Sequence, residues 1–147
     1  MTYNIKHYDL LTKDELYQIM KLRNEVFVVE QTCVYQDIDG KDLDAYHLCC
    51  YEGDELIGYL RILNPGLSYK EMSIGRVLVK DTYRDKKIGK LIMEESINYI
   101  KEVLNQTVVR ISAQAYLQKF YTSLGFDTVS EEYLEDDIPH IEMLLNM

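Results

Sequence analysis

Residues 74–97, IGRVLVKDTYRDKKIGKLIMEESI, constrain the possible fold more than any other stretch of the chain. They read as an apolar strand, then a basic turn, then a helix whose apolar positions share one broad face. Free backbone N–H groups point out of the first turn of a helix, and the helix dipole adds about half a positive charge there. Because Gly89 also lets a ligand approach the backbone closely, the pattern predicts an anion site. The alternative is an ordinary connection with surface lysines.

The charge of the chain is unevenly spread, which bears on its partners. The formal net charge is −9, yet residues 80–90 hold five basic and two acidic residues and carry +3, so the remainder carries −12. The overall acidity argues against nucleic acid as a partner. The uneven distribution favours an anionic ligand at the basic segment and a cationic ligand elsewhere.

Length and composition indicate a single domain over residues 1–147, with 47% apolar residues to supply a core. No run approaches the ~20 apolar residues of a membrane span, and the first ten residues lack the apolar stretch of a signal peptide. The three cysteines, with Cys49 and Cys50 adjacent, suit a reducing compartment. We therefore expect a cytoplasmic protein with no membrane partner, and a homodimer stays an open alternative.

The order of predicted elements favours a mixed α/β fold with a partly antiparallel central sheet of about six to seven strands flanked by helices. A capping box at Thr12 and Glu15 predicts the start of the first helix. Strands are predicted at residues 3–8, 47–52, 56–63, 72–79, 108–113 and 140–145, and helices at residues 13–28, 87–103 and 116–124. Residues 29–45 are predicted to be a long irregular segment, which in a compact domain is usually functional or disordered.

That irregular segment contains an acidic cluster. Four aspartates lie within eight positions of the stretch YQDIDGKDLDAYH: Asp37, Asp39, Asp42 and Asp44. The spacing excludes a calcium loop of the EF-hand type, because Gly40 arrives two residues early and Leu48 stands where the bidentate glutamate belongs. A solvated turn and a site that attracts a cation remain as alternatives.

The basic turn resembles motif A of the GNAT superfamily of acetyltransferases, whose pattern is Q/R-x-x-G-x-G/A. Arg84 fills the first position and Gly89 the last, while Lys87 stands where the family usually has its first glycine. A lysine enters a positive-φ conformation less readily than glycine, so this departure bears on the shape of the turn.

A second stretch, AQAYLQKFYTSLGF, is similar to GNAT motif B, often N-x-x-A-x-x-F-Y-x-x-x-G-F. The residues that align with it are Phe120, Tyr121, Gly125 and Phe126, whereas Gln114 replaces the usual Asn and Leu117 the Ala. With VFVVEQTCVYQDIDG, IGRVLV and IPHIEM, the resemblance is to the ElaA-like branch and spans about residues 16–143.

The resemblance implies that acetyl-CoA is the co-substrate and that no metal takes part. In the family, motif A holds the pyrophosphate, and the preceding strand pairs with the pantetheine arm and stabilises the oxyanion. Carried over to this sequence, the contacts fall on Val77, Leu78, Val79, Arg84, Asp85, Lys86, Lys87, Ile88, Gly89, Lys90, Gln114 and Tyr121. Tyr121 is the predicted general acid for the leaving thiolate, and the alternative is a core tyrosine. Gln114 is expected to bind the pantetheine amides or to cap the next helix.

The acceptor side is assigned to the irregular segment, which walls that site in GNAT folds. We predict Glu30 or Asp39 as the general base, because a carboxylate in an acidic cluster can have a raised pKa. The predicted acceptor-binding residues are Glu30, Asp37, Asp39, Arg76, His47 and His140, the two histidines being rival bases. Arg76 is expected to pair with Asp39 or Glu30. Asp42 and Asp44 are expected to face solvent, and Cys33 is not expected to act as a nucleophile.

The predicted function is transfer of an acetyl group from acetyl-CoA to a primary amine by direct attack through a tetrahedral intermediate. The amine can belong to a small molecule or a peptide, and the sequence does not identify it. Two alternatives stay open. Arg23, Phe27 and the acidic segment also resemble acyl-homoserine-lactone synthases, and a non-catalytic acyl-CoA sensor would share the fold.

Overall fold

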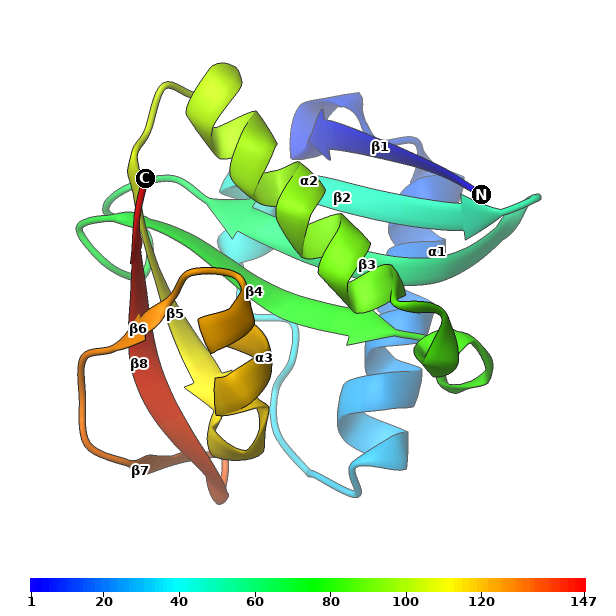
Figure 1. Ribbon diagram of the computed structural model, residues 1–147. Coiled ribbons are helices and arrows are strands. Elements are labelled where there is room, and N and C mark those ends of the chain that lie inside the picture. The colour runs from blue at the N-terminus through cyan, green and yellow to red at the C-terminus, as the bar shows by residue number, and fades with distance from the viewer.

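One sheet holds the protein together. The computed structural model describes the backbone of residues 1–147 and all side chains except those of Asp85 and Lys86, so the predictions for these two lie outside the described residues. Within the described chain, eight strands form the sheet in the order β1-β2-β3-β4-β5-β8-β6, with β7 paired to β8 (Figure 1). The strands are β1 Thr2–His7, β2 Ala45–Glu52, β3 Glu55–Leu63, β4 Met72–Val79, β5 Val108–Gln114, β6 Asp127–Thr128, β7 Tyr133–Glu135 and β8 Ile138–Asn146.

Helices and short helical turns connect the strands. The α-helices are α1 Lys13–Arg23, α2 Ile88–Glu102 and α3 Gln118–Ser123, with the π-helix η2 Asn24–Glu30 and the 3₁₀ turns η1 Tyr8–Leu10, η3 Lys41–Asp44, η4 Asp81–Lys86 and η5 Ala115–Leu117. The mixed α/β prediction is confirmed, although six to seven strands were expected. Strands β6 and β7 have only two and three residues, too few to show a pattern in the sequence.

The first helix begins where the capping box predicts. Thr12 Oγ1 accepts from the Glu15 backbone N–H at 3.1 Å, and Glu15 Oε1 accepts from the Thr12 backbone N–H at 2.9 Å. The single predicted helix over residues 13–28 is divided, because the α-helix ends at Arg23 and continues as the π-helix η2. A π-helix inside a helical run often marks a functional site.

The two faces of the sheet bury separate cores. Helices α2 and α3 cover the front face and α1 covers the back (Figure 1). Neighbouring residues of β2 divide between the faces, as strand alternation requires: Leu48 and Cys50 pack with α2, whereas Cys49 packs with Ile19 of α1. No helix of the described chain is long and apolar enough to cross a membrane.

The start of α2 lies unusually close to the sheet at Gly58 of β3. A Cβ atom added at Gly58 would lie 3.2 Å from Cγ2 of Ile88 and 3.3 Å from Cβ of Cys50. A larger residue at position 58 would require Ile88 or Cys50 to shift by a few tenths of an ångström, so glycine lets the first turn of α2 pack closely against β3.

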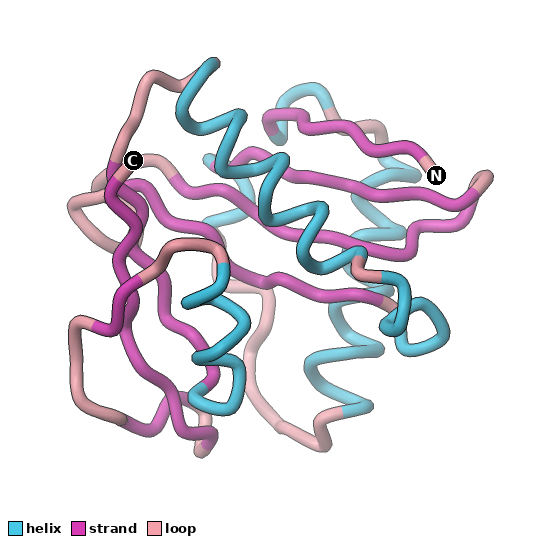
Figure 2. The backbone as a smooth tube through the Cα atoms, viewed as in Figure 1, coloured by secondary structure: helices cyan, strands magenta, loops and turns pink.

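Strands β4 and β5 begin together and then separate. Their parallel ladder has only two registered pairs, Met72 with Val109 and Ser73 with Arg110, and beyond these the strands diverge (Figure 2). On its other side, β4 carries one extra residue against β3, and Arg76 lies at this bulge with φ 51°. The later half of β4 therefore has no strand partner on the side that faces β5, and the opening between the strands becomes a cleft.

Candidate active site between the diverging strands

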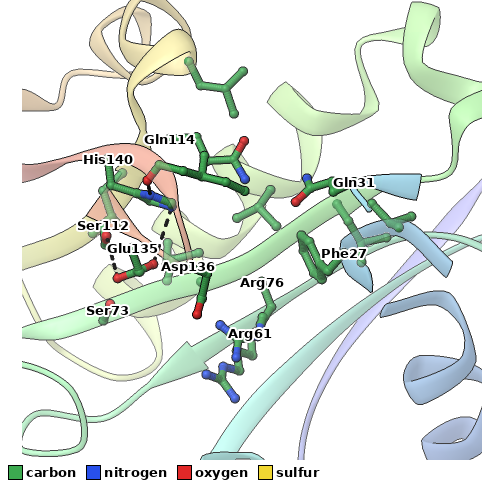
Figure 3. A pocket seen from close by; sticks show the side chains of 18 of the residues that line it. Phe27, Gln31, Arg61, Ser73, Arg76, Ser112, Gln114, Glu135, Asp136 and His140 are labelled. Atoms are coloured by element: carbon green, nitrogen blue, oxygen red, sulfur yellow. Dashed lines mark hydrogen bonds and ion pairs between the residues drawn. The ribbon is translucent and has the colours of Figure 1, made fainter. Parts of the chain in front are cut away.

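The cleft has a volume of about 1060 Å³ and is lined by residues from β4, β5, η2, α3 and the β7–β8 hairpin (Figure 3). The predicted site residues that line it are Glu30, Asp39, Arg76, Val77, Leu78, Val79, Arg84, Gly89, Gln114, Tyr121 and His140. Among the other predicted residues whose side chains are described, Asp37 and His47 lie in the interior, and Lys87, Ile88 and Lys90 lie around the start of α2 without lining the cleft.

The start of α2 keeps the left-handed turn despite its unusual residue. Lys87 has φ 57° and ψ 26°, a conformation that costs a residue other than glycine on the order of 1–3 kcal/mol. No described side chain caps this helix. Near its start, the Leu91 N–H donates to the Lys87 carbonyl at 3.2 Å. The N–H groups of the first turn and the helix dipole favour an anion here.

Tyr121 and Gln114 lie on the α3 and β5 side of the cleft. The Tyr121 ring packs between Phe120 and Phe126, with centroids 5.0 and 6.0 Å away, and burial raises the pKa of its hydroxyl to about 12. Within the described part of the chain, the hydroxyl has no hydrogen-bond partner. Gln114 ends β5 and makes no side-chain capping bond to the following turn, so its amide is available to a ligand in the cleft.

The acidic segment forms a closed ring of ion pairs with three arginines. Each arginine contacts two aspartates and each aspartate contacts two arginines: Arg23 with Asp37 (2.8 Å) and Asp42 (2.7 Å), Arg61 with Asp42 (2.9 Å) and Asp39 (2.6 Å), and Arg76 with Asp39 (3.5 Å) and Asp37 (2.7 Å). The Arg23 side chain is completely buried, and a buried cation needs such partners. These aspartates therefore neutralise arginines that come from α1, β3 and β4.

The ring corrects two predictions. Asp42, expected to face solvent, is buried, while Asp44 is exposed as expected. Burial alone would raise the pKa of Asp39, but hydrogen bonds from Arg61 and the Lys41 backbone hold that pKa well below its usual range. This is opposite to the raised value that made Asp39 a candidate base. The expected pairing of Arg76 with Asp39 is confirmed.

The other predicted base, Glu30, is also bound to an arginine. Its carboxylate accepts two hydrogen bonds from Arg84, and these lower the pKa of Glu30. The prediction of Glu30 as the general base does not fit this geometry, since a carboxylate paired with an arginine is a weaker proton acceptor.

His47 was predicted to contact the acceptor, and the structure places it elsewhere. It is fully buried, with Nδ1 2.6 Å from the Tyr59 hydroxyl and Nε2 3.0 Å from the Asp42 carbonyl. Burial lowers its pKa, which keeps the imidazole neutral in the core.

Sequence reasoning missed the wall formed by the β7–β8 hairpin. Ser112, Glu135 and Asp136 line the cleft beside His140, across from Arg76 (Figure 3). Polar residues recur at every second position of VVRISAQ, a signal that could have indicated a polar cleft face on β5. Among the described residues, no group of three His, Cys, Asp or Glu side chains could hold a metal ion.

The fold and the cleft define an acyl-CoA N-acyltransferase architecture, and the comparisons with known proteins agree. The sequence profile described as acetyltransferase (GNAT) domain matches residues 11–147, so the chain belongs to the GNAT acetyltransferase family. This confirms the resemblance found in motifs A and B, and the family fold implies an acyl-CoA co-substrate.

Individual relatives match over nearly the whole chain. The Escherichia coli K12 protein ElaA is 43% identical over 139 residues, which is 93% of this chain and 91% of that protein. The crystal structure of Escherichia coli ElaA has a TM-score of 0.92 at 41% identity, covering 99% of this chain and 100% of the other. A Pseudomonas aeruginosa structure described as an acyl-CoA N-acyltransferase has a TM-score of 0.92 at 43% identity and covers 99% of both chains.

Proposed function

We propose that the protein transfers an acetyl group from acetyl-CoA to a primary amine, which attacks the thioester directly. The observation that carries the proposal is the coincidence of three features on one cleft. These are the half of β4 that has no strand partner toward β5, the start of α2, which no described side chain caps, and the hydroxyl of Tyr121, a residue that lines the cleft.

The binding of acetyl-CoA is argued from the first two features. Its pyrophosphate would accept hydrogen bonds from the N–H groups of the first turn of α2, with Lys87 and Lys90 adding positive charge. The pantetheine amides need donors and acceptors. The edge of β4 at Val77–Val79, where Arg84 Nε already donates to the Val79 carbonyl, and the amide of Gln114 supply them.

The chemistry joins a nitrogen to the acyl carbon and releases a thiolate. The C–N bond forms as the C–S bond breaks, and backbone N–H groups of β4 stabilise the oxygen that becomes negative. The raised pKa of Tyr121 keeps its hydroxyl protonated at neutral pH, so it holds a proton for the thiolate. The ring of ion pairs between Asp37, Asp39, Asp42 and the three arginines (the Arg–Asp ring) holds the π-helix side of the cleft in place. The positive charge of the acceptor is balanced by Glu135 and Asp136, which line the opposite wall.

The test is release of free thiol from acetyl-CoA in the presence of a panel of primary amines that includes spermidine, L-lysine and tyramine. Calorimetry with coenzyme A runs in parallel. Thiol release that depends on one or more amines is expected. Coenzyme A binding without turnover on any amine would instead favour the sensor function.

A further inference from the structure

The polar wall of the cleft is built by strand alternation on β5 and β8. Val109, Ile111 and Ala113 pack into the core with α2 and α3, so the alternate residues, Ser112 among them, face the other way. On β8, His140 lies directly opposite Gln114, and residues paired in this way share a face of the sheet. His140 is therefore held beside the residue proposed to bind the pantetheine arm.

The hydrogen bonds of His140 fix which ring nitrogen carries the proton. Nδ1 lies 2.6 Å from the Ile138 carbonyl, and a carbonyl only accepts, so Nδ1 donates. In the neutral imidazole, Nε2 then has the free lone pair. Nε2 lies 3.4 Å from Oε2 of Glu135, a carboxylate that can bond to Nε2 only after Nε2 gains a proton.

The Glu135 carboxylate is itself held in place from β5. Ser112 Oγ donates to Glu135 Oε1 at 3.2 Å (Figure 3). The Tyr133 hydroxyl lies 2.5 Å from the same Ser112 oxygen. The Tyr133 ring also stacks on His140, with centroids 6.2 Å apart and planes inclined by 26°. These hydrogen bonds, from Tyr133 to Ser112 and from Ser112 to Oε1 of Glu135, leave Oε2 of Glu135 for the imidazole of His140.

Most of the other titratable groups around His140 keep their protons at neutral pH or have partners of their own. Burial raises the pKa of Tyr133, and it raises that of Tyr69, from the β3–β4 connection, to about 12, so both hydroxyls keep their protons at neutral pH. Glu142, also on β8, is paired with Arg110 at 3.0 Å. Asp136 lines the cleft at the hairpin tip with φ 50°, and its carbonyl accepts from the thiol of Cys33 across the cleft at 3.5 Å.

We propose that His140 is the catalytic base that takes the proton from the acceptor amine, and that Glu135 is the residue that positions and stabilises it. The proposal rests on the proposed acetyl transfer. An alkyl ammonium loses one proton to Nε2, which passes it to solvent. The neutral nitrogen forms the C–N bond, the C–S bond breaks, and the second nitrogen proton leaves through the same imidazole. Tyr121 protonates the thiolate and regains its proton from solvent.

The first test is kinetic and uses the full-length protein, acetyl-CoA and the most active amine of the panel. His140→Gln is expected to lower kcat by about 10²-fold or more, whereas coenzyme A affinity and the melting temperature change little. Hydroxylamine is largely unprotonated at neutral pH, so the rate with hydroxylamine as acceptor should fall less in His140→Gln than the rate with the alkyl amine. Glu135→Gln should lower kcat while coenzyme A affinity stays unchanged, because the imidazolium formed during the reaction loses its carboxylate partner. His7→Gln, on the distant β1 edge, is the matched control and should change none of these.

The second test reads the proton directly by NMR of isotope-labelled histidine. Neutral His140 is expected as the Nδ1–H tautomer, and the opposite tautomer would overturn the proposal. If the parent is active and the His140→Gln variant is equally active, the role of His140 as base is overturned, while the proposed acetyl transfer stands. A parent that binds coenzyme A but acetylates no amine would overturn the proposed function, and the proposal would fall with it.

Discussion

The carboxylate of Glu30 and the guanidinium of Arg84 form two parallel hydrogen bonds, at 2.7 and 2.6 Å. Glu30 ends the π-helix η2 and Arg84 belongs to the turn before α2, so the pair joins two walls of the cleft. Arg84 Nε also donates to the Val79 carbonyl at 2.9 Å. A phosphate that binds Arg84 therefore competes with Glu30.

This competition predicts that Glu30→Gln tightens coenzyme A binding. Both side chains are partly exposed, and exposed ion pairs contribute about 0.2–1 kcal/mol, so the dissociation constant should fall by roughly 1.5- to 5-fold. Calorimetry at low salt measures the change. Glu25→Gln removes the same charge from the same π-helix and is the control. Unchanged or weaker binding in Glu30→Gln would show that Arg84 does not contact the phosphates.

Gly89→Asp is expected to abolish coenzyme A binding while the fold stays intact. A Cβ atom at Gly89 would meet Phe120 at 3.8 Å and Val79 at 3.9 Å, which are ordinary contacts, so the new side chain fits. Its carboxylate would stand at the start of α2 and repel the pyrophosphate. Gly89→Ala is the matched control and should bind coenzyme A much more tightly than Gly89→Asp. If the aspartate variant binds as well as the parent, with an unchanged melting temperature, the pyrophosphate site lies elsewhere.

Tyr121→Phe removes one hydroxyl and keeps the packed ring. Turnover should fall by about 10²-fold or more, because the thiolate loses its proton donor. Coenzyme A affinity and thermal stability should barely change, since the hydroxyl has no partner in the described part of the protein. Thiol release and thermal melting measure the two effects. Full turnover in the variant, where chemistry limits the rate, would assign Tyr121 to the core alone.

How far the sequence could predict the site depends on how local each interaction is. The basic turn, the capping box at Thr12 and the position of Tyr121 follow from short spacings, and the structure places these residues in the expected elements. Position 87 keeps the left-handed turn even though lysine stands where the family usually has glycine.

The acidic segment shows where sequence reasoning fails. Asp37, Asp39 and Asp42 looked like a free negative cluster, because their counter-charges come from three distant elements. The isolated Arg76 predicted one of these pairings, with Asp39, but spacing along the chain gave no sign of those with Arg23 and Arg61. Likewise, Glu135 gains its role from β5 and β8, which only the folded sheet brings together.

The Arg–Asp ring predicts a large and pH-dependent loss of stability in Asp42→Asn. The substitution leaves the buried Arg23 with Asp37 as its remaining ring partner, and breaking a buried pair costs about 3 kcal/mol or more. Burial alone would raise the pKa of Asp42, but hydrogen bonds from Arg23 and Arg61 lower it overall.

The sign of the pH dependence follows from that lowered pKa. The pKa of an unfolded aspartate is about 3.9. The stabilisation by ionised Asp42 is therefore fully present above that pH, and it is lost as the pH falls through the lower pKa of the folded state. Denaturant unfolding should therefore show a constant gap between parent and Asp42→Asn from pH 7 to about pH 5, which narrows in stronger acid. Asp44→Asn, two residues away and exposed, is the control and should shift stability by less than about 0.5 kcal/mol. Equal stability of Asp42→Asn and the parent at pH 7 would show that the ring does not hold the segment.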